Sequence, residues 1–312
     1  MIKIALRWLT GAIPVLFLVS LITFVLSDLV PGNAARSILG ANATDAQVAA
    51  LTGQLGLNRP LPVRYWDWLT GALHGDLGTS VFTGEPVSRA MVDRLPVTIS
   101  LIGGAVLLAG LLGAGLGVAS ALRGGWLGRA VDVIALLGMA IPGFWFALVL
   151  VTLFAVKLPL FPATGYTPFT VSPVGWFESL VLPVLTLGIP AAAPVAKQTR
   201  DGVLTELGRP YVGVLRARGV PEHAVILKHV LRNAAAPVVT VLGIVAVVLL
   251  GGTVLAENVF VVPGLGGLAV SATAAHDIPT IQAIAVLFTV IVLVVSLLIE
   301  MVYAVVNPKV RT

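Results

Sequence analysis

Six continuous apolar runs dominate the chain, separated by polar segments of unequal length. The runs cover about residues 8–30, 97–122, 130–156, 179–196, 234–256 and 281–306. A helix that spans a bilayer needs about 20 predominantly apolar residues. The apolar residues are continuous rather than alternating, and lipid admits only helices or closed barrels because backbone groups must be satisfied internally. The pattern therefore predicts an all-α integral membrane protein with about six transmembrane helices.

Prolines interrupt two of these runs. Pro142 lies within the third run, and Pro183, Pro190 and Pro194 lie within the short fourth run. Proline removes a backbone donor and clashes with the preceding turn of a helix. We therefore expect the third and fourth spans to be broken or kinked at these positions.

The first long polar segment, residues 31–96, follows the first run. It contains an aromatic group of Tyr65, Trp66 and Trp68, which is typical of the membrane–water interface. Residues 63–73 are predicted to form a short helix on the outer surface. An ordinary external loop with an interfacial anchor and a segment that contacts substrate both remain open.

The second polar segment, about residues 197–233, has a helical pattern. Pro210 suits the first turn of a helix, and Tyr211, Val214 and Leu215 fall at positions i, i+3 and i+4, on one face. Arg216 and Arg218 lie mostly off that face. Gly219 is placed where a glycine ends a helix.

A second short helix is predicted to begin at Pro221. Glu222 would lie near its positive end, and Lys228, His229 and Arg232 near its negative end, as the helix dipole favours. The prediction for the segment is helix, glycine break, helix, with a small apolar face. A solvated loop does not need such a face, whereas a partner groove does.

The distribution of basic residues predicts the orientation. The chain has 19 Lys and Arg against 14 Asp and Glu, and charged residues form only 11% of it, compared with about 25% in soluble domains. With both termini inside, the cytoplasmic side holds 13 of the 19 basic residues, as the positive-inside rule favours. These are Lys3, Arg7, Arg123, Arg129, Lys197, Arg200, Arg209, Arg216, Arg218, Lys228, Arg232, Lys309 and Arg311. The net charge of +5 is thus a topology signal, and no motif points to nucleic acid.

Close helix packing is predicted in the second run. Gly113 and Gly117 have the GxxxG spacing that lets two helices approach closely. We interpret the pair as packing within the chain, and a subunit interface is the alternative.

Motifs for catalysis, cofactors and metals are absent from the sequence. It contains no GxxxxGK[ST] loop for ATP, no HExxH pair and no GxSxG elbow. With no cysteine, thiol catalysis and disulfides are excluded. We therefore expect a chain that is not an enzyme. Glu257 and Asp277 flank a segment rich in glycine and proline, residues 257–280, and are candidates for the outer mouth of a pathway.

Several short motifs together resemble a known family. The polar segment carries Tyr211-Val212, Arg216-Ala217-Arg218-Gly219 and His229-Val230-Leu231-Arg232-Asn233. Other matches run along nearly the whole chain: Leu55-Gly56-Leu57-Asn58-Arg59-Pro60, Gly75-Asp76-Leu77-Gly78, Leu182 to Gly188, Pro263-Gly264-Leu265-Gly266 and Asn307-Pro308. The set resembles the B-type permeases of binding-protein-dependent ABC importers, in the dipeptide/oligopeptide and nickel branch, whose cytoplasmic loop is often called the EAA loop. Gly213 stands near the place of the loop's usual glutamate, and Val214-Leu215 replace smaller residues.

The resemblance implies an architecture and a set of partners. The fold would be a type I ABC importer transmembrane domain, with residues 1–95 forming the first helix and the external segment, and residues 96–307 the permease domain. Its coupling residues would be Tyr211, Val214, Leu215, Arg216, Arg218 and Gly219. The partners would be a second homologous permease subunit, two cytoplasmic ATP-binding subunits, an extracytoplasmic substrate-binding protein, a peptide substrate and the lipid bilayer. The location would be the bacterial plasma (inner) membrane, crossed several times, with both termini cytoplasmic.

Two alternatives remain at this point. A stand-alone secondary transporter or channel would carry buried charges in mid-span for coupling ions, and the apolar runs hold almost none. Within the importer class, nickel chelates, glutathione or another small solute could replace peptides as the substrate.

Overall fold

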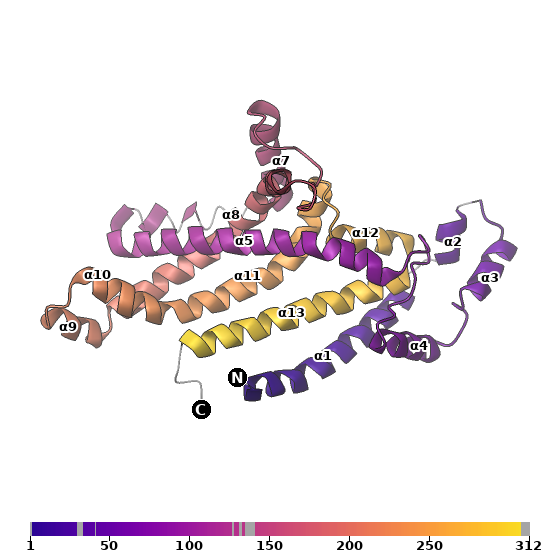
Figure 1. Cartoon of the computed structure of the whole chain (residues 1–312), viewed down its shortest axis with the longest axis horizontal. Helices are drawn as coiled ribbons and strands as arrows, with labels where there is room; N and C mark the ends of the chain where they lie inside the picture. Colours follow the sequence, from indigo (N-terminus) through magenta and orange to yellow (C-terminus); the bar gives the residue numbers. More distant parts are fainter. Residues whose placement is uncertain are drawn as a thin grey trace. The chain divides into compact units, whose positions relative to one another are not determined.

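The computed structural model describes residues 2–29, 34–40, 42–126, 128–130, 133–134 and 141–306. Within these ranges the chain is helical, and its one extended pairing is an isolated bridge between Thr79 and Pro86. The helices are α1 Ile2–Leu29, α2 Ala34–Leu39, α3 Asp45–Gln54, α4 Leu61–Leu73, α5 Val87–Arg123, α7 Gly143–Val151, α8 Pro173–Leu207, α9 Pro210–Ala217, α10 Glu222–Ala224, α11 Leu231–Val259, α12 Leu265–Ala275 and α13 Ile278–Val306. Two π-helical stretches, η1 Thr152–Lys157 and η2 Val225–Val230, continue α7 and join α10 to α11 (Figure 1).

Five of the described helices are long and apolar enough to cross a membrane. They cover Trp8–Leu29, Val87–Arg123, Pro173–Leu207, Glu222–Val259 and Ile278–Val302, which agree with five of the six predicted runs. The third predicted span, residues 130–156, lies partly outside the described residues. Its longest described stretch is the shorter apolar helix Gly143–Lys157, which begins directly after Pro142.

The predicted break in the fourth span is wrong. Residues 173–207 form one continuous helix, with Pro183, Pro190 and Pro194 inside it. Membrane helices tolerate proline because neighbouring helices and local adjustments satisfy the freed backbone groups. The resulting helix is much longer than the predicted apolar run and carries the chain out to residue 207.

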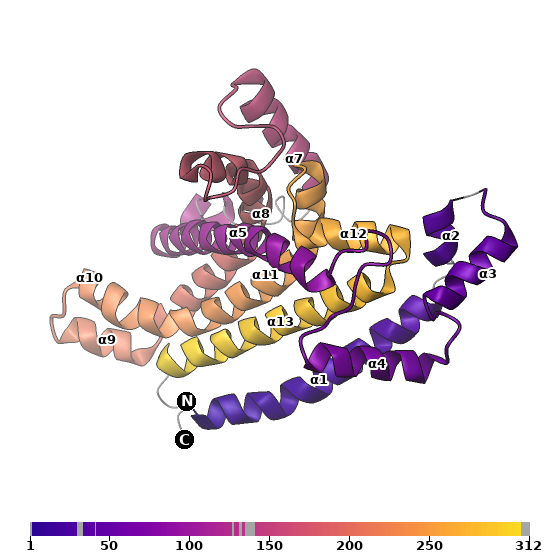
Figure 2. The same cartoon turned by 45° about the vertical axis from the view of Figure 1, so that its right-hand side comes forward.

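The chain divides into two compact units. Unit 1 contains residues 1–98 and 263–294, and unit 2 contains residues 99–262 and 295–312. In unit 1, Val87, Met91, Leu265 and Ala283 form a buried apolar cluster. The α4 helix lies beside α1 in this unit in both views (Figure 2).

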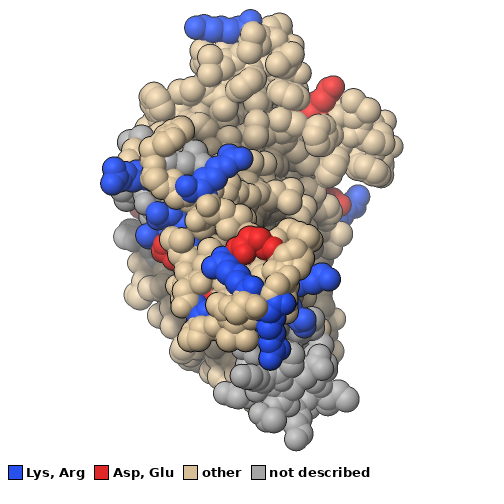
Figure 3. All heavy atoms as spheres, turned by 90° about the vertical axis from the view of Figure 1, so that its left-hand side faces the viewer, with Lys and Arg blue, Asp and Glu red and all other residues tan. Residues whose placement is uncertain are grey.

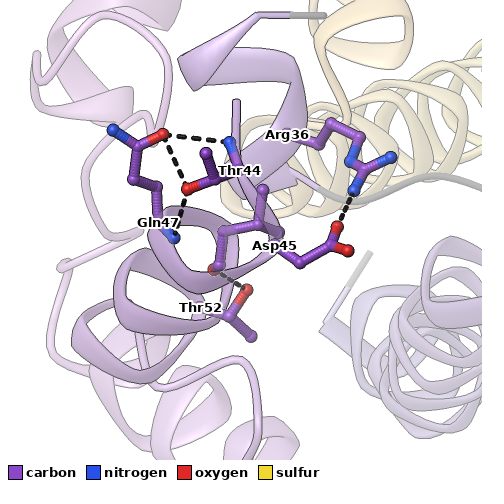
Figure 4. Close-up of polar contacts among 6 residues, drawn as sticks. Arg36, Thr44, Asp45, Gln47 and Thr52 are labelled. Atoms are coloured by element: carbon purple, nitrogen blue, oxygen red, sulfur yellow. Dashed lines mark hydrogen bonds and ion pairs between the residues drawn. The ribbon is translucent and has the colours of Figure 1, made fainter. Parts of the chain in front are cut away.

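A capped helix organises the external segment of unit 1. The Thr44 side chain accepts a hydrogen bond from the backbone of Gln47, and the Gln47 side chain accepts one from the backbone of Thr44, which is a capping box. Arg36 of α2 forms an ion pair with Asp45 at the start of α3, at 2.6 Å (Figure 4). These contacts give α3 a defined beginning, although its sequence is only weakly apolar.

In unit 2, glycines allow α5 and α8 to approach closely. A Cβ atom at Gly113 would lie 2.6 Å from Val195 Cβ, and one at Gly117 would lie 2.5 Å from Thr199 Cβ. Such distances leave no room for any side chain. The predicted GxxxG contact is confirmed as packing between two helices of this chain.

The α8 and α11 helices form the pair that carries the candidate site. A Cβ atom at Gly252 of α11 would lie 3.4 Å from Leu187 of α8, and one at Gly202 of α8 would lie 3.5 Å from Ala234 of α11. The two helices therefore stay in contact over a long distance. The short helices α9 and α10 connect them at one end (Figure 1).

Candidate coupling surface

The α9 helix forms where the sequence predicts it. Arg209 has extended backbone angles, with φ −72° and ψ 142°, and Pro210 is the first helical residue. The missing donor of proline is harmless in a first turn. The helix runs for eight residues and ends at Ala217.

Gly219 ends the helix in the predicted way. Its φ is +74°, a left-handed conformation that favours glycine. The Gly219 amide donates to the carbonyl of Arg216 at 3.0 Å, and the Val220 amide donates to the carbonyl of Leu215 at 3.1 Å. This pair of bonds is the Schellman motif, and it fixes the direction in which the chain leaves α9.

Buried side chains hold α9 against its own unit. Val212 is 1% exposed and belongs to a cluster that joins the ends of α5, α8 and α11. The cluster contains Ala121, Val203, Val212, Val225, Val230 and Ala234. Tyr211 and Leu215 pack against this cluster, so two members of the predicted apolar face point toward the chain itself. Val212, which lies outside the predicted apolar face, is the most buried residue of α9.

Tyr211 also makes polar contacts to both neighbouring long helices. Its hydroxyl donates to Glu206 Oε2 of α8 at 2.9 Å and accepts from Asn233 Nδ2 of α11 at 3.2 Å. Burial raises the pKa of the Tyr211 hydroxyl above its usual range, so it is neutral and can donate at physiological pH. These bonds tie α9 to the ends of α8 and α11.

The exposed side of α9 is a different apolar stripe, which we call the outer face. It consists of Pro210, Gly213, Val214 and Ala217, all of them exposed, at the i, i+3, i+4 and i+7 spacing of one helical face. Val214 is its only large apolar side chain and is 52% exposed. Of the three apolar residues predicted to face a partner, only Val214 therefore lies on the outer face.

Basic residues flank the outer face. Arg209 lies 3.5 Å from Glu206, and Arg216 forms two hydrogen bonds with Glu222, one of them from Nε at 3.0 Å. The contact with Glu222 raises the pKa of Arg216. Arg218 is exposed and makes no ion pair within the described part of the chain. Lys and Arg side chains gather on the face of the molecule that carries α9 and α10 (Figure 3).

The predicted second short helix is corrected. The helix that begins after Pro221 does not end near Arg232 but continues through η2 into α11, which ends at Val259. No glycine lies between Pro221 and Pro237, and Pro237 is accommodated inside α11. Lys228, His229 and Arg232 therefore do not lie at a negative helix end, and their predicted match with the dipole is wrong.

Both acidic residues proposed for the pathway mouth are buried. In unit 2, Glu257 is 2% exposed in the last turn of α11. In unit 1, Asp277 is 3% exposed, and its carboxylate accepts bonds from the Ser80 and Thr280 hydroxyls and the Val81 amide. The segment between them contains the helix α12 and is not a simple loop. Asp277 thus holds the turn at Ser80. The two residues are 197 positions apart in sequence, so no local sequence pattern could predict this contact.

No group of three or more His, Cys, Asp or Glu residues in the described ranges is arranged to hold a metal ion. The candidate site is a short helix with one face held against its own unit and the other face exposed.

Comparison with known families identifies this architecture. Residues 109–312 match the model of the binding-protein-dependent transport system inner membrane component, and residues 1–102 match the N-terminal model of such membrane components. The chain belongs to this family. It is the membrane permease component of an ABC importer and not a catalytic enzyme, and membership implies ATP-binding and substrate-binding partners. The reading as a stand-alone secondary transporter or channel is therefore set aside.

Relatives align with this permease over its full length. It is 38% identical over 312 residues to a protein of Brucella abortus (strain 2308) named as a peptide transport system permease, covering 100% of this chain and 99% of the relative. A protein of Sinorhizobium fredii named as a peptide ABC transporter permease is 38% identical over 307 residues, covering 98% of each. The glutathione transport system permease protein GsiC of Salmonella choleraesuis is 39% identical over 313 residues, covering 100% of this chain and 99% of the relative.

Proposed function

We propose that this permease imports peptides delivered by an extracytoplasmic substrate-binding protein, and that α9 transmits the ATP-driven movement. The assembly would contain a second, homologous permease subunit and two cytoplasmic ATP-binding subunits. The names of the relatives support a peptide substrate, since two are peptide permeases and the third serves glutathione, which is itself a peptide. Nickel chelates and other small solutes are the alternative cargo.

The observation that carries the coupling role is the two-sided construction of α9. Val212, Tyr211 and Leu215 attach it to the ends of α8 and α11, while the outer face remains apolar and exposed. A force on the outer face would therefore move the ends of both long helices together. Gly219 and Arg218 complete the surface at the C-terminal end of α9.

The charges around the outer face indicate what kind of groove on the ATP-binding subunit would bind α9. The apolar stripe is narrow and is flanked by Arg209, Arg216 and Arg218, and the nearby carboxylates of Glu206 and Glu222 are already engaged. Opposite charges at an interface rim steer association and select the partner. The groove on the ATP-binding subunit would therefore be shallow and apolar, with an acidic rim.

With both termini inside, as proposed, the outer face of α9 would lie in the cytoplasm. The majority of basic residues lie on the side that carries α9 and both termini when six spans are counted, as the positive-inside rule favours. Residues 1–95 would form the first helix and the external segment, residues 96–307 the permease domain, and Glu257 and Asp277 would be pathway residues.

Substitution of Val214 tests the coupling proposal. A charged side chain at the centre of a small apolar contact is expected to weaken docking by about tenfold, which is about 1.4 kcal/mol. Val214→Glu should therefore lower the amount of ATP-binding subunit that co-purifies with the permease and should reduce peptide uptake.

Val171→Glu is the matched control, because Val171 is 75% exposed and precedes α8, at the end opposite α9. Both variants introduce the same charge on an exposed valine. Equal retention of the ATP-binding subunit by the two variants would count against α9 as its docking element.

A further inference from the structure

The α4 helix packs on α1 in unit 1 through one regular stripe. The stripe consists of Leu61, Arg64, Tyr65, Trp68, Leu69 and Ala72, all less exposed than the neighbouring Val63, Trp66 and Asp67. Tyr65 is the centre of the contact: its ring lies 6.2 Å from that of Phe17 and 5.4 Å from that of Phe24, and its hydroxyl lies 2.9 Å from Ser20 Oγ.

The residues of α1 that contact α4 show which part of this membrane-spanning helix α4 lies beside. Arg64 forms an ion pair with Asp28 at 2.7 Å, one residue before α1 ends at Leu29. Ser20 lies eight residues earlier, about 12 Å along the helix at about 1.5 Å per residue. The Tyr65 ring therefore lies alongside the apolar part of α1, nearer to mid-span than Asp28 at the charged end of that helix.

The opposite side of α4 is also apolar. Val63 is 40% exposed, Trp66 63% and Leu73 78%. The Thr70 hydroxyl donates to backbone carbonyls of its own helix, and the one acidic residue of this side, Asp67, is paired with Arg59 at 2.8 Å. A helix between protein and water would show mainly polar residues on its outer side, whereas Asp67 and Thr70 are the only polar side chains on this side of α4.

We propose that α4 lies within the lipid interface at the C-terminal end of α1, with Val63, Trp66 and Leu73 among the acyl chains. The occupant of this side is lipid because the face of α1 that carries α4 continues toward mid-span with exposed apolar side chains: Phe17, whose ring contacts Tyr65, is 50% exposed, and Ile13, one turn earlier, is 61% exposed. Interfacial helices bury an apolar face about 5–10 Å into the boundary between headgroups and acyl chains. The two ion pairs of Arg59 and Arg64 would lie at headgroup level.

This placement gives the external segment a second attachment to the membrane. The segment between α1 and α5 would be held by α4 as well as by its two ends, so that α2 and α3 remain close to the membrane surface. The inference does not depend on the coupling role of α9 or on the identity of the cargo.

Spin labels on single introduced cysteines test the proposal directly, because the chain has no cysteine. Labels at Trp66→Cys and Leu73→Cys would be measured in the assembled transporter, in vesicles of phosphatidylethanolamine and phosphatidylglycerol. Collision rates with molecular oxygen, which concentrates in lipid, would be compared with those of a water-soluble nickel chelate. Ile22→Cys on α1 is the lipid control, and Ala49→Cys on the exposed side of α3 is the water control.

The expected result is an oxygen-to-nickel collision ratio at both positions that is several-fold higher than at position 49 and similar to that at position 22. A ratio like that at position 49 would place α4 in water and overturn the proposal. Low collision rates with both reagents would show that a protein partner covers this side, and would overturn it too. If the Trp66 variant is not recovered, the Leu73 variant alone decides.

Discussion

At the scale of single residues, Gly219 and Tyr211 define how α9 is held. The left-handed conformation of Gly219 sets the direction in which the chain leaves α9. The Tyr211 hydroxyl links α9 to α8 and α11. The glycine could be predicted from sequence because its role is local. The direction of Tyr211 could not, because helical spacing alone does not distinguish a face that covers its own core from one that covers a partner.

Replacement of Gly219 by alanine should disturb the end of α9. A left-handed conformation costs an L-residue about 1–2 kcal/mol, so the Schellman turn would weaken and the outer face would lose its fixed direction. We expect substrate-stimulated ATP hydrolysis to fall severalfold, at unchanged membrane expression.

Gly208→Ala is the matched control, because Gly208 also adjoins α9 but has a φ of −79°, with no contact closer than 3.6 Å at an added Cβ. Similar activity in the two variants would argue that the conformation of Gly219 has no role in coupling.

Removal of the Tyr211 hydroxyl should loosen α9 without unfolding it. Tyr211→Phe keeps the packed ring but deletes the hydrogen bonds to Glu206 and Asn233, each of which contributes about 0.5–1.5 kcal/mol. Hydrogen exchange of the α9 amides should become faster, while exchange in the middle of α8 stays the same. A double-mutant cycle with Asn233→Ala should show coupling, and strictly additive effects would mean that the contact between Tyr211 and Asn233 is energetically silent.

At the scale of helices, most elements follow from the apolar pattern, and the exceptions have physical reasons. Five spans coincide with apolar runs, but the length of α8 does not, because its final turns are polar and its prolines are tolerated by neighbouring helices. The continuation of α10 into α11 through η2 was also not predicted. The basic residues Lys228, His229 and Arg232 indicated a helix end near residue 232. However, no glycine or helix-breaking proline lies there to end the helix.

Only one of two glycines in α5 should lose stability when it is replaced by alanine. At Gly117 an added Cβ would lie 2.6 Å from the Ala196 carbonyl oxygen of α8, so Gly117→Ala should push the helices apart and lower the melting temperature of the purified transporter. At Gly115 nothing lies within 4 Å, so Gly115→Ala should be neutral or stabilising, since alanine favours a helix by about 1 kcal/mol over glycine. The same sign for both variants would contradict the close approach of α5 and α8.

At the scale of the whole molecule, family membership and the helices agree on a multi-pass permease, and labelling from each side of the membrane tests the proposed orientation. Thr83 and Thr205 are exposed and belong to segments placed on opposite sides by the basic residues. Single cysteines at these positions should react with a membrane-impermeant reagent from opposite sides, position 83 from outside intact cells. Reaction of both positions from outside would reverse the assignment of α9 to the cytoplasm.

Cross-linking from the outer face of α9 tests the central claim most directly. A photoreactive group on Val214→Cys, in the assembled transporter, should join this permease to an ATP-binding subunit. The yield should change when ATP is bound, because the coupling role requires that contact to move. The same group on Val171→Cys should give no such product. Products from position 214 that contain only lipid or the second permease subunit would contradict the account.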